Sequence, residues 1–211
     1  MDSTHLPSLQ ENYAKALSLI DEAHARDPNK IPSPDGTGEV PYELHYAQKM
    51  TRWLSQRCPD APPTLQLACR AQHFRRWEMP RSSYPMTRPG YLTWRAKQKT
   101  QAAAQVKELL SSMDAPIPAD ECNRISSLIS KQDLANDEET QILEDVACLV
   151  FLDDQFDDFE KNPDHDEEKI LRILQKTWVK MSDKGREMAT QMKHSDRARS
   201  LIEKAVSQAS E

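Results

Sequence analysis

Apolar residues recur every three or four positions along most of the chain, which is the pattern of helices with one buried face. Proline, glycine, asparagine and aspartate separate these stripes, and such residues end helices or form turns. Only four glycines, few aromatic residues and many charges also favour helices over sheets. We predict an all-α, single-domain bundle of about eight helices. They cover residues 7–27, 41–56, 63–77, 91–113, a stretch after 118, 137–160, 167–181 and 184–207.

The helix over residues 137–160 is predicted to be the most buried one, because the run from Ile142 to Leu152 leaves no polar face. Glu144 and Asp145 lie near the start of this run. Two adjacent carboxylates in a core are costly unless a metal, an arginine or a shared proton compensates them. We therefore take Glu144 and Asp145 as candidate catalytic residues.

Composition limits the possible partners of the chain. The net charge is -6 and the mean hydropathy is -0.79, and no apolar run reaches membrane-spanning length. No charged-then-apolar leader opens the chain. We expect a cytoplasmic protein with no membrane partner, and the overall charge disfavours nucleic acid. The four cysteines, Cys58, Cys69, Cys122 and Cys148, show no metal-binding or disulfide spacing, so we expect free thiols.

The segmentation of the chain follows its breaker residues. We predict an N-terminal helix within 1–27, a linker rich in Pro, Gly and Asp over 28–40, a main domain over 41–189, and a C-terminal helix and tail over 190–211.

Cations and aromatic rings concentrate between Arg70 and Arg95, where Glu78 is the single acid. Crowded guanidinium groups repel one another unless anions lie among them, and arginine suits a bidentate grip on carboxylate or phosphate. We expect a pocket for a small anionic metabolite. The alternative is that these arginines pair with the chain's own acids. The candidate binding residues are Arg70, Arg76, Trp77, Arg81, Tyr84, Arg88, Arg95 and, further along the chain, Lys180.

The loop over residues 79–90 holds three prolines and one glycine, so its backbone is stiff. A stiff loop between helices is suited to presenting binding side chains. Two candidate catalytic residues precede it. Glu43 lies on the apolar face of its helix and needs a buried partner. His73 follows Arg70 by one turn, and its alternative role is that of an ordinary core histidine.

Four blocks of sequence carry a resemblance to a known family: LACRAQHFRRWEMPRSSYP, MTRPGYLTWR, QILEDVACLVFL and KILRILQKTWVKMSDKG. Together they resemble the family catalogued as domain of unknown function 4202, over residues 41–189. Fungal members of that family carry the label glutamyl-tRNA synthetase-like. The order of its motifs is similar to that of HD-type metal phosphohydrolases, which are helical bundles.

The HD-like resemblance implies a divalent metal held by His73 and Asp145, with Glu43 or Glu144 assisting. A family histidine in the helix after the loop corresponds to Ala102 in this chain. A site that lacks this histidine would hold a metal weakly and through oxygen ligands, so Mg or Mn fits better than Zn. The absence of this histidine also allows a pocket that works without a metal ion.

We therefore expect an enzyme that acts on a small anionic metabolite, with acid-base groups among Glu43, His73, Glu144 and Asp145. An HD-like hydrolase is one form of this hypothesis. A metal-independent lyase, isomerase or cyclase of secondary metabolism is another. The third hypothesis is a non-catalytic metabolite-binding protein, and a homodimer is left open.

Overall fold

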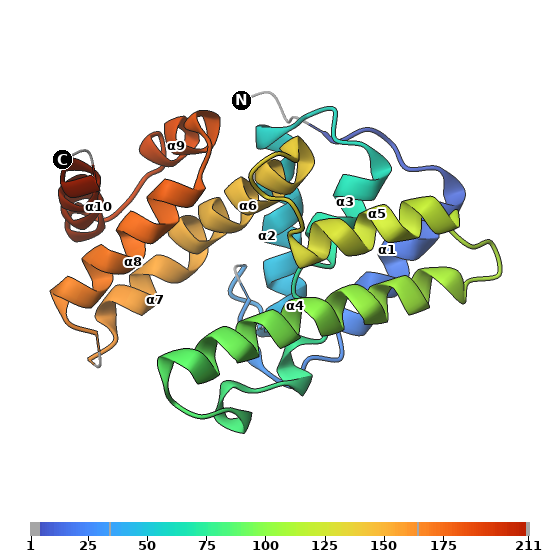
Figure 1. The fold of residues 1–211 in the computed structure, drawn as a ribbon, viewed down its shortest axis with the longest axis horizontal. Coiled ribbons are helices and arrows are strands. Elements are labelled where there is room, and N and C mark those ends of the chain that lie inside the picture. The colour runs from blue at the N-terminus through green and yellow to red at the C-terminus, as the bar shows by residue number, and fades with distance from the viewer. Residues whose placement is uncertain (1–4, 34, 164, 210–211) are drawn as a thin grey trace. The chain divides into compact units, whose positions relative to one another are not determined.

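Helices dominate the structure, as the periodicity of the sequence predicts (Figure 1). The computed structural model describes residues 5–33, 35–163 and 165–209, and these ranges contain ten α-helices and one two-stranded hairpin. The all-α class is thereby confirmed. The chain divides into two compact units, Met1–Leu143 and Glu144–Glu211.

The first unit is organised around its third helix. Residues 65–70 are all buried, and the helix packs against α1, α2 and α5. α5 also packs along α4, as Figure 1 shows. The helices of this unit are α1 (Glu11–His24), α2 (Tyr42–Arg57), α3 (Pro63–Arg70), α4 (Arg88–Ser111), α5 (Ala119–Ser130) and the first turns of α6 (Glu138–Val150).

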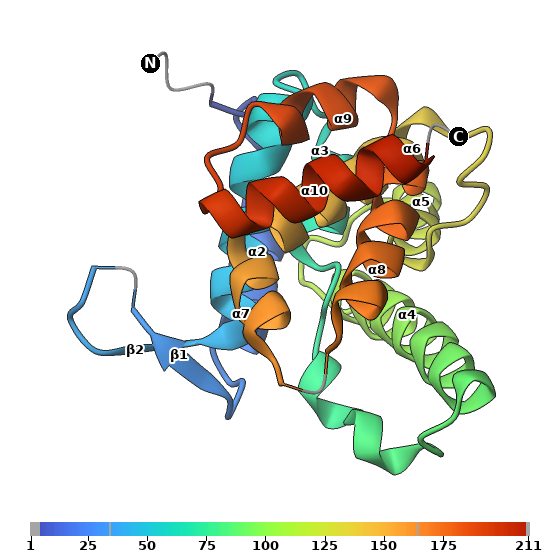
Figure 2. The same ribbon diagram turned by 90° about the vertical axis from the view of Figure 1, so that its left-hand side faces the viewer.

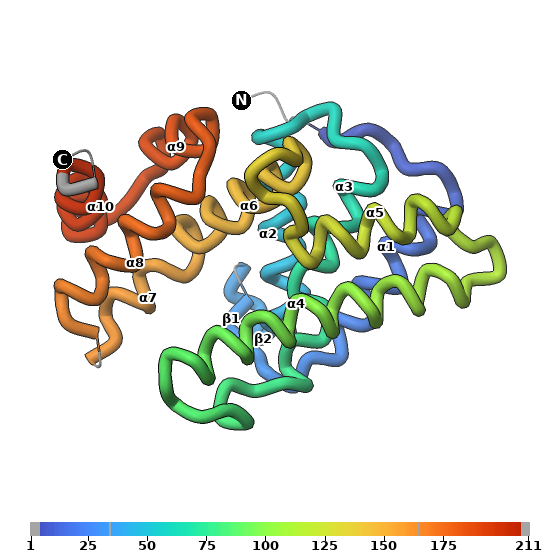
Figure 3. The backbone as a smooth tube through the Cα atoms, viewed as in Figure 1, coloured from blue at the N-terminus to red at the C-terminus, as the bar shows by residue number. Residues whose placement is uncertain are grey.

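The expected linker contains a small hairpin, β1 (Lys30–Pro32) and β2 (Glu39–Pro41), in which Ile31 pairs with Val40 (Figures 2 and 3). Asp35 closes its turn, because one carboxylate oxygen accepts hydrogen bonds from Ser33 and Thr37. These hydrogen bonds lower the pKa of Asp35 to about 2. Strands of three residues are too short to show the alternation of polar and apolar side chains by which a strand is recognised in a sequence.

The helix expected over 63–77 ends early, at Arg70. Arg75 then adopts a left-handed backbone conformation, with φ of 50°, which no continuous helix can accommodate. The elbow, residues 71–87, continues through two short 3-10 turns, η1 (Arg76–Glu78) and η2 (Arg81–Ser83). The Thr87 side chain then accepts a hydrogen bond from the Gly90 amide and starts α4.

The second unit contains the rest of α6, the π-helical turn η3 (Phe151–Gln155), α7 (Phe156–Lys161), α8 (Glu167–Lys180), α9 (Asp183–Thr190) and α10 (Asp196–Ala209). α8 packs against α10. The helix expected over 184–207 is two helices, because the Ser195 hydroxyl accepts a hydrogen bond from the Ala198 amide and begins a new one. The helix expected over 137–160 is interrupted by η3.

Two further expectations can be compared with the structure. All four cysteines are free, as predicted; Cys58 is half-buried and the other three are buried. Within the described ranges, no helix is both long enough and apolar enough to cross a membrane.

Candidate functional site

The turn after α3 places His73 inside the first unit. Ala71 and Phe74 are buried on either side of it and anchor the turn. The amide of Arg76 donates a hydrogen bond to the His73 carbonyl, and the left-handed Arg75 lies between them. A left-handed non-glycine residue costs about 1 kcal/mol, so this turn is held by its surroundings. The result is that the His73 and Arg76 side chains share one face.

The His73 imidazole is almost fully buried between groups from three parts of the unit. Its ring stacks on Tyr46 of α2, with 3.9 Å between centroids and 8° between planes. The Tyr46 hydroxyl donates to Gln72 Oε1 at 3.0 Å, which fixes the stack. Arg76 Nη1 lies 2.8 Å from His73 Nε2, and Glu43 Oε2 lies 3.4 Å from His73 Nδ1.

These contacts define the protonation of His73. An arginine can only donate hydrogen bonds, and Arg76 Nη1 lies closer to Nε2, at 2.8 Å, than to Nδ1, at 3.3 Å, so the geometry favours Nε2 as the acceptor and the ring proton on Nδ1, on the side of Glu43. Burial, followed by the charges of Arg76 and Arg95, holds the pKa of His73 well below its usual value. His73 is therefore a neutral imidazole at neutral pH.

Glu43 is the buried acid predicted from its place on the apolar face of its helix, and only 3% of it is exposed. Burial raises the pKa of Glu43 to about 8, although Arg76 acts in the opposite direction and Asp27 reinforces the rise. Asp27 also accepts a hydrogen bond from the Glu43 amide at 3.0 Å. Glu43 thus holds a proton at neutral pH, and its contact with His73 joins two uncharged groups.

A small pocket opens beside this pair, with about 260 Å³ of empty space that is partly open to solvent. Three of its described lining residues, Arg76, Arg95 and Lys99, are cationic, and none is acidic. α4 supplies one side of the pocket, and Ala102, whose side chain is small, leaves room there. The lining residues are Gln72, His73, Phe74, Arg76, Arg95, Gln98, Lys99 and Ala102.

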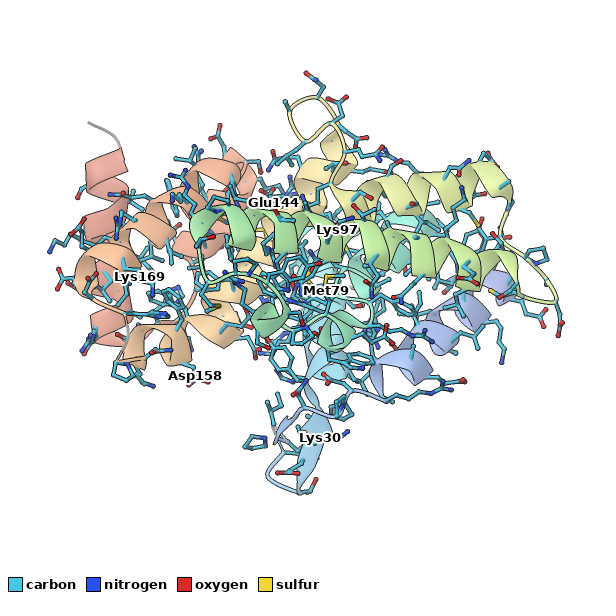
Figure 4. The ribbon with its side chains drawn as sticks, turned by 60° about the horizontal axis from the view of Figure 1, so that its bottom comes forward. Lys30, Met79, Lys97, Glu144, Asp158 and Lys169 are labelled. Atoms are coloured by element: carbon cyan, nitrogen blue, oxygen red, sulfur yellow. The ribbon has the colours of Figure 1, made fainter. Side chains whose placement is uncertain are left out.

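Trp94 joins the elbow to α4. Its indole nitrogen donates to the carbonyl of Met79 at 2.9 Å; Met79 is labelled in Figure 4. The guanidinium carbons of Arg76, Arg81 and Arg95 lie 5.5, 5.8 and 5.9 Å from the centroid of the Trp94 ring. This cation–π grouping keeps three cations close together in a chain that is acidic overall.

Other predicted binding residues have structural partners. Arg70 pairs with Asp21 through two hydrogen bonds of 2.6 and 2.7 Å, so the ion-pair alternative holds for Arg70. Arg81 donates to the carbonyls of Tyr84 and Pro85 and fastens the loop. The Tyr84 hydroxyl contacts the Met79 sulfur at 3.5 Å.

Two further residues of the predicted binding set, Trp77 and Arg88, differ in exposure. Trp77 is half-buried and Arg88 is exposed on the first turn of α4. Among the described residues of the predicted binding set, the pocket is lined by Arg76 and Arg95.

Glu144, Asp145 and Lys180 belong to the second unit. Both carboxylates are buried, as predicted. Asp145 accepts hydrogen bonds from the Ser182 amide at 2.8 Å and the Ser182 hydroxyl at 2.5 Å, which holds the start of α9. Glu144 lies 3.5 Å from the ammonium of Lys180. These contacts stabilise the junction of α8 and α9.

The surroundings of His73 do not fit a divalent metal. Glu43 is its carboxyl neighbour, and Arg76 places a permanent cation 2.8 Å from Nε2. Across the described ranges, no group of three or more His, Cys, Asp or Glu side chains is placed to hold a metal ion. A protonated Glu43 and a guanidinium beside His73 are poor surroundings for Mg or Mn.

Sequence reasoning missed several residues of the site. Tyr46 has the position of an ordinary core residue on the predicted helix over 41–56, and Gln98 and Lys99 carry no signal beyond being polar. Asp27 is the last residue of the predicted helix over 7–27, and that position gives no sign of its contact with Glu43. The one available hint was that Gln72 interrupts an otherwise apolar surface without adding charge.

Comparison with known proteins gives a family but no named relative. No curated protein and no solved structure matches the chain significantly. A family model matches residues 14–202, which extends beyond both ends of the 41–189 segment identified from the sequence blocks. The chain therefore belongs to the family described as domain of unknown function (DUF4202).

Proposed function

We propose that the chain is a metal-independent enzyme that binds a small anion in the pocket beside His73 and moves a proton with that residue. The observation that carries the proposal is the environment of Arg76. Its contacts are with His73 and the Trp94 ring, and no carboxylate in the described part of the chain lies at ion-pair distance from it. A partly buried guanidinium without an ion pair is a natural binding group for an oxyanion.

The rest of the pocket supports a small anionic ligand. Arg95 and Lys99 add two positive charges to its wall, and Phe74 and Ala102 add apolar surface. The enclosed space of the pocket is about 20 Å³, room for about one water molecule, so a compact carboxylate or phosphate would bind partly at its solvent-open side and a nucleotide would not fit inside.

The chemistry follows from the neutral state of His73. An anion that draws Arg76 towards itself would release Nε2 of His73, and this nitrogen could then accept a proton from the bound molecule. The imidazolium so formed keeps Nδ1–H facing Glu43. An ionised Glu43 stabilises that charge, so we expect turnover to rise with pH as the pKa of Glu43, about 8, is approached. Proton transfer of this kind suits a lyase or isomerase.

Binding is tested by thermal denaturation and calorimetry with phosphate, sulfate and a panel of small mono- and dicarboxylates. We expect at least one of these anions to stabilise the chain, and we expect Arg76→Gln to remove that stabilisation. Arg52→Gln is the matched control, because Arg52 is an exposed arginine of the same unit. If no anion stabilises the wild type, or if both variants respond alike, the pocket does not bind anions through Arg76.

A second candidate function is a non-catalytic anion-binding protein, and one observation favours it. Both nitrogens of His73 already face protein groups, Arg76 and Glu43, so neither is open to a ligand without a rearrangement. An NMR time course of the bound anion separates the two functions. Chemical change or deuterium exchange that His73→Asn abolishes, while binding persists, identifies the enzyme; an unchanged ligand identifies the binder.

A further inference from the structure

One end of α4 exposes an unusual group of apolar side chains. The described large apolar residues that are well exposed include Met86, Tyr91 and Leu92, at 79%, 47% and 57%, and these three lie within seven positions. Exposed Arg88 lies between Met86 and Tyr91 in the sequence, and exposed Lys97 follows Leu92 on the same helix. We call these five residues the basic tip. Contiguous apolar side chains bordered by cations mark an interaction surface more often than single exposed residues do.

The stretch of sequence that contains the basic tip carries charge of one sign. From Met79 to Lys107 the sequence contains no aspartate or glutamate. The cations in this stretch are Arg81, Arg88, Arg95, Lys97, Lys99 and Lys107. A surface of one sign selects a partner of opposite sign and speeds its approach.

The second unit carries a surface of the opposite sign. From Asp153 to Glu168, Lys161 is the single lysine or arginine in the sequence. Asp153, Asp157 and Asp158 are exposed on η3 and α7. We call these three residues the acidic face; Lys97 on α4 and Asp158 on α7 are labelled in Figure 4.

We propose that the basic tip of one copy of the chain docks on the acidic face of a second copy. The charge complementarity of two exposed surfaces of the same chain carries this inference. An anionic bilayer or a nucleic acid would also attract the basic tip, but it would repel a chain whose net charge is -6.

The two kinds of side chain in the tip have distinct consequences for association. The charged pairs are exposed and therefore weaken as salt rises, because screening acts within about 10 Å at 0.1 M ionic strength. The apolar side chains lose water on docking, and that contribution does not depend on salt in the same way. We expect association that weakens with salt but is not abolished by it.

Sedimentation velocity of the full chain over a range of concentrations and salt measures this association. Lys97→Glu and Asp158→Lys each place like charges at the proposed contact, so each should lower the association constant about tenfold. An equimolar mixture of the two variants should recover the wild-type value, since every tip then meets an opposite charge. Neither residue lines the anion pocket.

A pair of apolar substitutions distinguishes association through the basic tip from nonspecific hydrophobic association. Leu92→Ser should weaken association, whereas Val179→Ser should leave it unchanged, because Val179 is more exposed than Leu92, at 67% against 57%, but lies outside both surfaces. A chain that remains monomeric at every concentration overturns the proposal. So does a mixture that fails to recover association. Monomers that sediment with phosphatidylserine vesicles would assign the tip to a lipid surface instead.

Discussion

The buried acid Glu43 makes the stability of this protein depend on pH in a direction opposite to that of most carboxylates. In the unfolded chain Glu43 has its ordinary pKa of 4.5, whereas burial raises the folded value to about 8. Between these values the folded state holds a proton that the unfolded chain has released. Unfolding therefore releases a proton, and the contribution of Glu43 to stability falls as pH rises. Glu43→Gln removes this titration and keeps the shape of the side chain.

The size of the effect follows from the linkage relation. One proton released on unfolding changes the free energy of unfolding by about 1.4 kcal/mol per pH unit at 25 °C. From pH 5.5 to pH 7, which lies within the window, the wild type should lose about 2 kcal/mol relative to Glu43→Gln. Other groups titrate in both proteins alike, so the difference between the two curves isolates Glu43.

Urea unfolding followed by circular dichroism at pH 5.5, 6.25 and 7 measures this difference. Glu108→Gln is the control, because Glu108 is an exposed glutamate of the same unit and should shift the curve by less than about 0.5 kcal/mol at every pH. If wild type and Glu43→Gln show the same pH dependence, Glu43 is not protonated inside the folded unit. The assignment of a neutral Glu43–His73 pair would then fail.

Three further substitutions test the packing of both units. Asp145→Ala leaves the Ser182 amide and hydroxyl without their acceptor and should cost about 2–4 kcal/mol in urea unfolding. Gly185→Ala should destabilise by about 1–3 kcal/mol, because its added methyl carbon would lie 2.7 Å from the Asp145 carboxyl carbon. Arg70→Met strands the Asp21 carboxylate, which is partly exposed, and should lower the thermal midpoint by several degrees, in line with a loss of about 1–3 kcal/mol.

Each of these predictions has an outcome that would contradict it. Asp183→Ala, at a fully exposed acid two positions before Gly185, should have almost no effect, so an equal loss would remove the special role of Asp145. Alanine normally stabilises a helix interior relative to glycine by about 0.5–1 kcal/mol. A stabilised Gly185→Ala variant would mean that the close approach to Asp145 does not exist. An Arg70→Met variant with unchanged stability would show that the Asp21 pair contributes nothing.

The sequence pattern selected two residues of the first unit, Glu43 and His73, that are buried in the structure, but not the groups that contact them. Glu43 and His73 could be selected because each interrupts a helical pattern that otherwise describes a buried face. Their contact could not be predicted, since it depends on how α2 meets the turn after α3. The Arg-rich stretch likewise indicated a cationic region, but local composition does not show which guanidinium has an acid nearby. Arg70 has Asp21, whereas Arg76 has His73 and the Trp94 ring.

The amino-acid sequence by itself determined that the protein is helical, where most of its helices lie, and that Glu43, Glu144 and Asp145 are buried. Those properties depend on neighbours within a few turns, and the sequence displays such neighbours directly. Tertiary structure alone decided the partners: Arg70 meets an acid 49 positions away and Asp145 meets a hydroxyl 37 positions away. The physical reason is that hydrogen bonds act over about 3 Å, so a polar side chain's role is set by whichever remote element packs beside it.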